Sequence, residues 1–393
     1  MTNLLYTITS YPPSTGGAQL YLHMLASNLI ATHDVQVVCQ WTNNRTDWLL
    51  GTTLLAPAQD RDYTIDGVNV HQYGMSIQEK CRLLLPVLGY YPLMGLALPE
   101  ISAPIQKHLQ YYAANRELVH NVRFGREGLS YASLAIARAQ GIPFVFTPVH
   151  HPRWVGWRYE AYIRLYQQAD VVLALTNAEK ATLVELGVKS DSIVVTGMGP
   201  NLAATANPQA FRQKHQIEGP IVLFIGQHYT YKGYQQLLAA APLVWRYVPE
   251  AHFVFIGPPV GNSENSYRAY TDRRIHRLGK VSLQEKTDSL AACTLLCVPS
   301  TQESFGAVYT EAWSFGRPVI GCDIPAVAEV ITDEIDGCLV KQEAQQIADR
   351  ICYLLLHPDK ADQMGVAGKQ QVDRQYTWSR IAAKTEAAYR TVL

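Results

Sequence analysis

The chain has 393 residues, and its 33 Lys and Arg residues balance its 33 Asp and Glu residues. A net charge of zero excludes the broad basic surface that nucleic-acid binding requires, so we expect no nucleic-acid partner. At a typical ~150 residues per domain, the length predicts two or three domains rather than a single core.

Apolar strand-like runs alternate with helical patterns along most of the chain, which is typical of α/β folds with mainly parallel sheets. Residues 1–9 contain no cationic start and no cleavage site, so they predict a first strand rather than a signal peptide. The strands predicted in the first half are residues 4–9, 35–39, 68–72, 117–120, 144–147, 171–174 and 192–195.

A loop containing Gly16-Gly17 follows the first predicted strand and precedes a helical pattern that runs to Leu29. Because glycine has no Cβ atom, Gly17 lets a ligand phosphate approach the backbone N–H groups of a helix start. Most glycine pairs after a strand only turn the chain, so this pattern alone is weak evidence for a site.

Two other segments of the first half have both a structural and a functional interpretation. Asp60-Arg61-Asp62 has an Asp-x-Asp spacing that can hold a divalent metal, but it stands in a polar loop, and we expect a solvated turn. Residues 83–99 carry no charge and contain three prolines, so they fall short of the ~20 apolar residues of a spanning helix. We expect a buried helical segment there; the alternatives are one wall of an apolar groove and a helix that rests on a bilayer.

Thr147-Pro148-Val149-His150-His151 follows the strand predicted at residues 144–147. A histidine at this place can hydrogen-bond a ligand, or it can simply be a capped loop residue. Residues 198–218 then interrupt the pattern and predict a connection to a second half. The strands predicted there are residues 221–226, 252–256, 275–278, 294–298, 318–322 and 338–340.

Two carboxylates, Glu303 and Glu311, lie eight positions apart across a predicted strand-to-helix junction. The helix expected over residues 307–315 would direct its first N–H groups, near residues 305–308, into the crevice where parallel sheets bind ligands. Glu303 precedes the helix and can face a group beyond a diphosphate, whereas Glu311 could bond a ribose. The simpler interpretation is two solvated acids near a helix start, where the dipole favours negative charge.

The motifs around this junction occur in a recognisable order. They are Glu303-Ser304-Phe305-Gly306, Glu311-Ala312, Gly316-Arg317-Pro318-Val319-Ile320, Glu329-Val330-Ile331 and Asp336-Gly337-Cys338-Leu339-Val340. Together they resemble the donor-site signature of the retaining glycosyltransferases of family 4. The resemblance implies the GT-B fold, an α/β architecture of two Rossmann-like, doubly wound domains that face a cleft. We expect an acceptor-side domain at residues 1–197, a linker at 198–218, a donor domain at 219–372 and a C-terminal segment at 373–393 whose helix crosses back to the first domain.

The resemblance also implies roles for individual residues. Glu303 would contact the donor sugar, Glu311 the ribose, and Lys232 in the loop 226–233 the departing diphosphate. The family histidine falls on Val149, so its role passes to His150 or His151, and we favour His150. The catalytic set is therefore Glu303, Lys232 and His150, and the donor-binding set is Gly17, Gln227, Lys232, Lys280, Val281, Glu303, Ser304, Phe305, Gly306, Ala307, Val308 and Glu311.

One position departs from the family pattern, because Gln227 stands where an arginine is usual. A glutamine is neutral and cannot make the charged fork of an arginine on a phosphate. Either the affinity for the donor is weaker, or His228, Tyr231, Arg153 or Arg158 compensates; we expect compensation.

The function that the resemblance implies is transfer of a hexose from a UDP-sugar to a hydroxyl acceptor with retained configuration, in polysaccharide or glycolipid synthesis. Retention can follow from attack on the leaving-group side or from a covalent intermediate on Glu303. The alternatives are a UDP-sugar 2-epimerase and a non-catalytic subunit of the same fold.

We expect no metal and no cofactor besides the nucleotide sugar. The seven cysteines are scattered and form no Cys-x-x-Cys pair, which predicts reduced thiols in a cytoplasmic protein. A lipid-linked saccharide acceptor would add peripheral contact with the inner face of the membrane.

Overall fold

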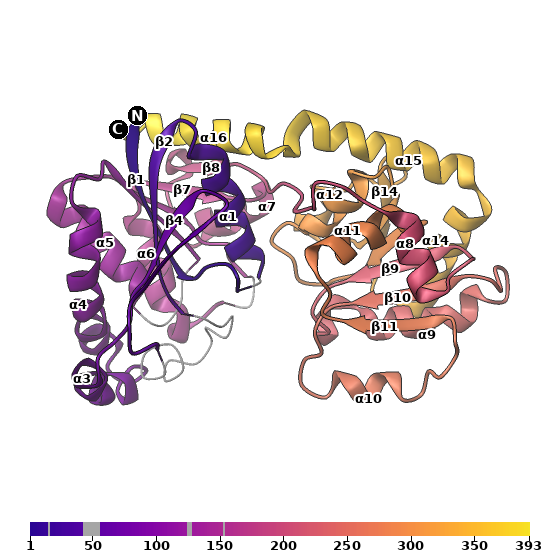
Figure 1. Cartoon of the computed structure of the whole chain (residues 1–393), viewed down its shortest axis with the longest axis horizontal. Coiled ribbons are helices and arrows are strands. Elements are labelled where there is room, and N and C mark those ends of the chain that lie inside the picture. Colours follow the sequence, from indigo (N-terminus) through magenta and orange to yellow (C-terminus); the bar gives the residue numbers. More distant parts are fainter. Residues whose placement is uncertain (15, 42–55, 124–127, 152–153) are drawn as a thin grey trace. The chain divides into compact units, whose positions relative to one another are not determined.

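The computed structural model describes residues 1–14, 16–41, 56–123, 128–151 and 154–393. The chain folds into two compact units (Figure 1). The first comprises residues 1–197 together with 378–393, and the second comprises residues 198–377.

The first unit is built on an eight-stranded sheet with the strand order β3-β4-β2-β1-β5-β6-β7-β8. Neighbouring strands are parallel except β3 and β4, which pair antiparallel at one edge. The strands are β1 (Thr2–Ser10), β2 (His33–Trp41), β3 (Arg61–Ile65), β4 (Val68–Gln72), β5 (Leu118–Val122), β6 (Phe144–Thr147), β7 (Val171–Ala174) and β8 (Ile193–Val195).

The edge strand β3 corrects the expectation that Asp60-Arg61-Asp62 lies in a loop as a solvated turn. Arg61 and Asp62 are the first residues of β3, and Asp62 lies opposite His71 in β4. The Asp62 carboxylate contacts His71 Nδ1 at 2.7 Å, while the Asp60 carboxylate accepts a hydrogen bond from the Gly74 N–H. The two acids therefore have separate structural partners.

Helices connect the strands of the first unit. They are α1 (Gly17–Leu29), α3 (Ile77–Leu88), α4 (Met94–Ala113), α5 (Leu129–Gln140), α6 (Glu160–Gln168) and α7 (Asn177–Glu185), with the short 3₁₀ turns η1 (Trp157–Tyr159) and η2 (Ser190–Ser192). In the part of the chain that the structure describes, no helix combines the length and the apolar composition needed to cross a bilayer.

The helix pair α3 and α4 corrects another expectation. The uncharged stretch 83–99 is largely helical as predicted, but it is only partly buried. Leu83 and Val87 face the core, whereas Leu85 is 78% exposed and Leu88 is 64% exposed. Composition alone does not distinguish the two faces of such a helix, because burial depends on the neighbouring elements.

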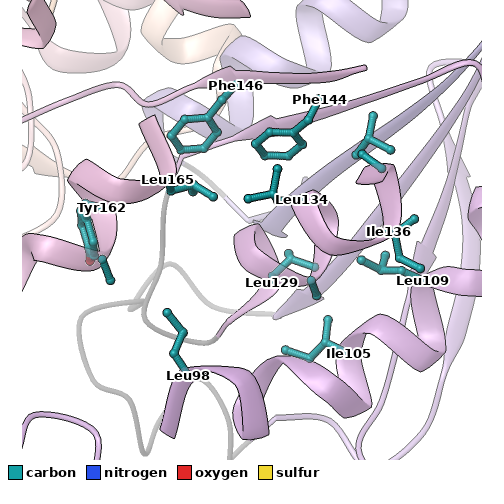
Figure 2. Close-up of a cluster of buried hydrophobic side chains, with 14 of the residues drawn as sticks. Leu98, Ile105, Leu109, Leu129, Leu134, Ile136, Phe144, Phe146, Tyr162 and Leu165 are labelled. Carbon is teal, nitrogen blue, oxygen red and sulfur yellow. The ribbon is translucent and has the colours of Figure 1, made fainter. Parts of the chain in front are cut away.

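Much of the core of the first unit lies where α4, α5 and α6 meet the sheet (Figure 2). Leu109 of α4, Leu129 of α5 and Leu165 of α6 are fully buried there against Phe144 and Phe146 of β6. This packing fixes β6 and therefore the place where the loop after it, with His150, begins.

The C-terminal helix α16 (Trp378–Arg390) belongs to the first unit, where it packs on α1. Its Tyr389 hydroxyl lies 2.9 Å from the Tyr6 hydroxyl of β1 and 2.6 Å from His120 Nδ1 of β5. His120 Nε2 in turn contacts Thr147 Oγ1 at 2.8 Å, so His120 links α16 to three strands of the sheet. Burial lowers the pKa of His120 to about 3, which keeps the imidazole neutral.

The second unit has a six-stranded parallel sheet with the order β11-β10-β9-β12-β13-β14. The strands are β9 (Ile221–Ile225), β10 (His252–Ile256), β11 (Ile275–Gly279), β12 (Leu295–Val298), β13 (Val319–Cys322) and β14 (Gly337–Val340). The helices are α8 (Pro208–His215), α9 (Tyr234–Val244), α10 (Ser263–Tyr267), α11 (Leu283–Ala292), α12 (Ala307–Trp313), α13 (Pro325–Ala328), α14 (Ala344–Leu356) and α15 (Pro358–Gln371), with the turn η3 (Thr230–Lys232) and the π-helical turn η4 (Val372–Tyr376).

The segment 198–218, which the sequence presents as a linker, is packed into the second unit. The Ala203 N–H donates to Thr287 Oγ1 of α11 at 2.9 Å, and the Asn207 N–H donates to Asp288 Oδ1 at 2.7 Å. Asn207 also caps α8, with its side chain accepting from the Ala210 N–H. This segment therefore places Asn201 beside the site described next.

Candidate functional site

The strand order of the second unit marks one place as a ligand crevice. From β9 the chain moves outward to β10 and β11, and it then returns to β12 on the other side of β9. Ligands of open parallel sheets bind beyond the carboxyl ends of the strands at such a reversal. The loops that leave β9 and β12 there are residues 226–233 and 299–306, which contain Lys232 and Glu303.

Hydrogen bonds to backbone carbonyl groups hold these two loops together. The Thr301 N–H donates to Tyr231 O at 2.8 Å, and the Gln342 amide donates to Tyr231 O at 2.8 Å and to Pro299 O at 2.7 Å. Gly233 has a φ of +80°, and a Cβ atom there would lie 2.5 Å from Pro299 O. The close approach of the loops thus requires glycine at this position.

Lys232 and Glu303 form an ion pair across the loops, with Nζ 2.5 Å from Oε1. Their side chains are only 20% and 12% exposed, so solvent screens the pair weakly. The ammonium also lies over the Tyr231 ring, 5.7 Å from its centroid. A positive charge and a carboxylate therefore stand side by side at the sheet reversal, where the sequence predicted them.

Glu311 on α12 lies almost fully buried beside a second cation. Its Oε1 atom contacts Lys286 Nζ of α11 at 2.8 Å and accepts from the Asn201 N–H at 3.3 Å. Its Oε2 atom is also buried and has no hydrogen-bond partner among the described residues. Such an oxygen has unused capacity to accept a hydrogen bond, as the hydroxyl of a sugar could supply.

The start of α12 explains why the sequence reads Phe305-Gly306. Gly306 is the N-cap with a φ of +86°, and a Cβ atom there would lie 2.4 Å from Cε2 of Tyr309. The Phe305 side chain is 2% exposed and packs edge-on against Tyr376, with ring centroids 5.2 Å apart. Because the ring of Phe305 is buried, the backbone of this residue, and not its ring, faces the outside of the loop. Ser304, Ala307 and Val308 beside it are half-buried.

The structure corrects one expectation about Gln227. His228 cannot supply the missing cation, because it is 1% exposed and stacks on Tyr234 with ring centroids 5.2 Å apart. Burial, assisted by the nearby Arg277, lowers the pKa of His228 to about 4, so its imidazole is neutral at pH 7. Gln227 itself is half-buried.

The other three candidates for that role have different positions. Tyr231 lies under the Lys232 ammonium. Arg158 belongs to the first unit and stacks over Tyr91 and Trp157. Arg153 lies outside the described residues.

The candidate residues of the first unit lie at the ends of β1 and β6. Gly17 is the first residue of α1, and a Cβ atom there would meet nothing within 4 Å, so space is open beside this backbone. His150 is 3% exposed, with Nδ1 3.2 Å from the Tyr166 hydroxyl. Burial lowers the pKa of His150 to about 4. His151, the alternative, is half-buried.

A buried carboxylate, Glu179 on α7, fixes the His150 loop. It accepts hydrogen bonds from the His150 N–H at 2.6 Å and from the Leu175 N–H at 2.7 Å, so it bridges the loops after β6 and β7. Burial raises the pKa of Glu179 to about 7 against the effect of these two donors. Val149, the residue before His150, has a φ of +49°, which is uncommon for a β-branched residue.

Lys280 and Val281 follow β11 as predicted, with Lys280 exposed and Val281 half-buried. Their contact with a base stays a prediction. Sequence reasoning missed Lys286, Gln342 and Glu179, because each acts through a partner that is distant in sequence and none stands in a recognisable motif.

Among the described residues, no group of three or more His, Cys, Asp or Glu side chains could hold a metal ion. The groups present at the β9–β12 reversal are the ammonium groups of Lys232 and Lys286, the carboxylates of Glu303 and Glu311, and backbone N–H groups. Such groups suit recognition of a phosphorylated sugar, because the cation favours phosphate and the carboxylates accept from hydroxyl groups.

Comparison with known proteins gives the following similarities. Residues 16–199 match the family described as glycosyl transferase 4-like domain, and residues 219–357 match the family described as glycosyl transferases group 1. The chain is 28% identical over 247 residues to D-inositol 3-phosphate glycosyltransferase of Kribbella flavida, covering 58% of each chain. It is 30% identical over 177 residues to phosphatidyl-myo-inositol mannosyltransferase of Mycobacterium leprae, covering 44% of this chain and 47% of that protein. The chain thus spans about half the length of these curated relatives.

A solved structure resembles the whole chain. The crystal structure of Anabaena Alr3699/HepE in complex with UDP-glucose superimposes with a TM-score of 0.75 at 18% identity, covering 99% of this chain and 100% of that one. At this level of identity the likeness shows the fold alone.

Proposed function

The chain has the GT-B fold and carries both domains of a glycosyltransferase, and from this premise we propose that it transfers a hexose from a nucleotide sugar to a hydroxyl acceptor. The observation that carries the proposal is the Lys232–Glu303 pair at the reversal between β9 and β12, with Glu311 buried nearby on α12. This is where a parallel sheet offers a ligand crevice, and the charges match a sugar diphosphate.

The donor would occupy the second unit as follows. Lys232 and the backbone N–H groups of residues 305–308 receive the diphosphate, Glu311 accepts from the ribose, and Glu303 accepts from the hexose hydroxyls. The residues proposed for the donor site in the second unit are Gln227, Lys232, Lys280, Val281, Glu303, Ser304, Phe305, Gly306, Ala307, Val308 and Glu311. The contact expected for Gly17 of the first unit stays a prediction. Lys280 and Val281 would lie at the edge of the base.

Charge develops on the diphosphate as the glycosidic bond breaks, and a preorganised cation lowers the cost of that charge. The loop contacts of Tyr231 hold the segment that carries Lys232, and Glu303 occupies the ammonium until the diphosphate replaces it. Because Lys232 and the helix N–H groups supply this stabilisation, we propose that the reaction needs no metal ion.

The hexose would keep its anomeric configuration. In the route that we favour, the acceptor hydroxyl attacks from the side of the leaving group and its proton passes to the diphosphate oxygen. The competing route forms a covalent intermediate on Glu303. His150, neutral at pH 7, would orient the acceptor by hydrogen bonding rather than by charge.

The donor that we propose is UDP-glucose or a related UDP-sugar, since the similar Anabaena structure holds UDP-glucose. For the acceptor we propose a lipid-linked saccharide of polysaccharide or glycolipid synthesis, a choice supported by the name of the M. leprae relative. The enzyme would then work in the cytoplasm at the inner face of the membrane.

The test is a donor screen that measures UDP or GDP release from a panel of nucleotide sugars by the full chain. We expect UDP release from a UDP-hexose, strongly reduced in Lys232→Ala and Glu303→Gln and unchanged in Lys369→Ala, an exposed lysine at the end of α15. No release from any donor, or equal activity in all variants, would refute the proposal.

Two further measurements separate the alternatives. Proton NMR of the donor without acceptor would reveal inversion at C2 if the chain were an epimerase. Calorimetry with UDP would show little heat if the chain were a non-catalytic subunit with a degenerate pocket.

A further inference from the structure

Lys286 and Glu311 form an ion pair between the neighbouring helices α11 and α12 of the second unit (Figure 1). Lys286 Nζ lies 2.8 Å from Glu311 Oε1, and the two side chains are only 15% and 5% exposed. Glu311 Oε1 also accepts from the Asn201 N–H at 3.3 Å. The other oxygen of the carboxylate, Oε2, is buried and has no hydrogen-bond partner among the described residues. The contacts of Glu311 are thus divided unequally between its two oxygens.

The helices that carry this pair begin at the two loops proposed to bind the ends of a nucleotide. Helix α11 follows Lys280 and Val281, where the base is expected, and α12 follows Gly306, where the diphosphate is expected. In a nucleoside diphosphate the ribose connects the base to the diphosphate. The pair therefore joins the two helices between whose starts a ribose would lie.

The two groups that occupy Glu311 Oε1 come from one connected part of the second unit. Thr287, next to Lys286 on α11, accepts with its Oγ1 atom from the Ala203 N–H at 2.9 Å. This contact ties α11 to the segment that also carries Asn201. The ammonium and the N–H group therefore reach the same oxygen from elements that are fixed to each other.

A carboxylate with one occupied oxygen has one direction left for a ligand. An ionised carboxylate only accepts hydrogen bonds, so the partner of Oε2 has to be a donor such as a hydroxyl group. Without the Lys286 ammonium, Oε1 would keep a single neutral donor, and the buried negative charge would lose its cation. Either oxygen could then accept from a ligand or from water. The cation is therefore suited to fix which oxygen faces the ligand.

We propose that Lys286 is a positioning residue of the nucleotide site, which holds Glu311 Oε1 so that Oε2 accepts from a ribose hydroxyl. The inference deepens the proposed function, on which it rests for the ribose contact of Glu311. The two ion pairs at the site then behave differently. The Lys232–Glu303 pair opens when a donor binds, whereas the Lys286–Glu311 pair stays closed and keeps Oε2 turned to the ribose.

The test compares the calorimetric affinity of the full chain for UDP, 2′-deoxy-UDP and 3′-deoxy-UDP. We define the hydroxyl selectivity as the Kd of the more weakly bound deoxy analogue divided by the Kd of UDP. We expect a selectivity of ~10–100-fold in the wild type, because the deoxy analogue lacks a hydrogen bond to a charged group. In Lys286→Met the selectivity should fall below ~3-fold, because UDP loses more affinity than the deoxy analogue does.

Two other variants separate positioning from stabilisation of the helix. Lys286→Arg keeps a cation and should retain most of the selectivity. The matched control is Lys214→Met, which removes another ion pair of α11, because Lys214 Nζ lies 2.6 Å from Glu285 Oε1. This control should keep the wild-type selectivity.

Steady-state kinetics with a UDP-hexose give a second measurement. Lys286→Met should raise the KM for the donor and leave kcat nearly unchanged, because the ribose is remote from the bond that breaks. An ion pair that only stabilises the fold would change neither the selectivity nor the KM of the folded enzyme.

Wild-type selectivity in Lys286→Met, or an equal loss in Lys214→Met, would overturn the inference and leave the proposed function intact. Equal affinity of the wild type for all three nucleotides would have the same effect. If Lys286→Met does not fold, a crystal structure of the wild type with UDP decides between the outcomes. We expect Lys286 Nζ within about 3.2 Å of Glu311 Oε1 and a ribose hydroxyl on Oε2. A hydroxyl that displaces Lys286 from Oε1 would overturn the inference, and a wild type that binds no UDP would refute the proposed function together with it.

Discussion

Lys232 and Glu303 neutralise each other before any donor enters, because the ammonium and the carboxylate are 2.5 Å apart. A diphosphate that binds at this place competes with Glu303 for the ammonium. In the proposed function Glu303 would then be released to accept from sugar hydroxyls, so that this one contact would couple recognition of the phosphate to recognition of the hexose.

Replacing Lys232 by Ala should therefore reduce turnover and donor affinity together. Loss of one preorganised charge at the leaving group typically costs ~10²–10³-fold in kcat. Steady-state UDP release gives kcat and KM for the donor. A variant with wild-type kcat would show that Lys232 does not contact the departing group.

Lys286 has a comparable relation to Glu311, although nothing in its sequence context indicated it. Lys286→Met should leave a buried carboxylate unpaired, which costs ~3–5 kcal/mol of the free energy of unfolding. The double variant Lys286→Met/Glu311→Gln should regain most of that stability but not the affinity for UDP. Denaturant unfolding measures the stability, and calorimetry measures the affinity for UDP. A double variant that binds UDP normally would show that Glu311 does not contact the nucleotide.

Glu179 should make stability depend on pH. Its pKa in the folded protein is raised from 4.5 to about 7 by burial, so the protonated form is the one that folding favours. The stabilisation is complete below pH ~4.5 and is lost as the pH rises through ~7. Between pH 5 and 8 the free energy of unfolding of the wild type should fall by up to ~3 kcal/mol relative to that of Glu179→Gln, in which residue 179 does not titrate. Parallel curves for the two proteins in denaturant unfolding would contradict this assignment.

Most of the strands were predictable, because each parallel strand is a short apolar run between turn signals. Strands β4, β6, β7 and β10 begin and end at the predicted residues. The edge strand β3 was missed, since its first two residues, Arg61 and Asp62, are charged and exposed. Edge strands often carry such charges, and here pairing with β4 outweighs the loop-like composition.

The exposure of α3 could not be predicted for a related reason. Its composition predicts an apolar helix, but which side is covered depends on α4, whose contacts lie elsewhere in the sequence. The same limit applies to the site. Lys232, Glu303 and Glu311 stand in motifs and could be predicted, whereas Gln342 joins the two loops from beyond β14 without any local signal.

The close approach of the loops 226–233 and 299–306 should depend on the glycine at position 233. Both Gly233 and Gly141 have a left-handed φ, at +80° and +66°, so alanine at either position should lower the free energy of unfolding by ~1–2 kcal/mol. Only at Gly233 would the new Cβ atom also press on Pro299 O, whereas it would meet nothing within 4 Å at Gly141. We therefore expect Gly233→Ala alone to weaken UDP binding in calorimetry. Equal UDP affinity in both variants would show that loop separation does not matter.

At the scale of the whole molecule, each unit carries some of the residues to which the proposal gives a role. The residues proposed to bind the donor lie in the second unit, and Gly17 and the His150 loop that Glu179 supports lie in the first. Helix α16 returns to the first unit through Tyr389, which contacts Tyr6 and His120. The resemblance to the family implied this return, and the cleft expected between the units stays a prediction.

The most direct test of the central claim is a crystal structure of the full chain with bound UDP-glucose. We predict a diphosphate oxygen within about 3.2 Å of Lys232 Nζ, a ribose hydroxyl on Glu311, and Glu303 moved from Lys232 to the hexose. A nucleotide bound elsewhere, or a Lys232–Glu303 contact unchanged beside the bound donor, would contradict this assignment.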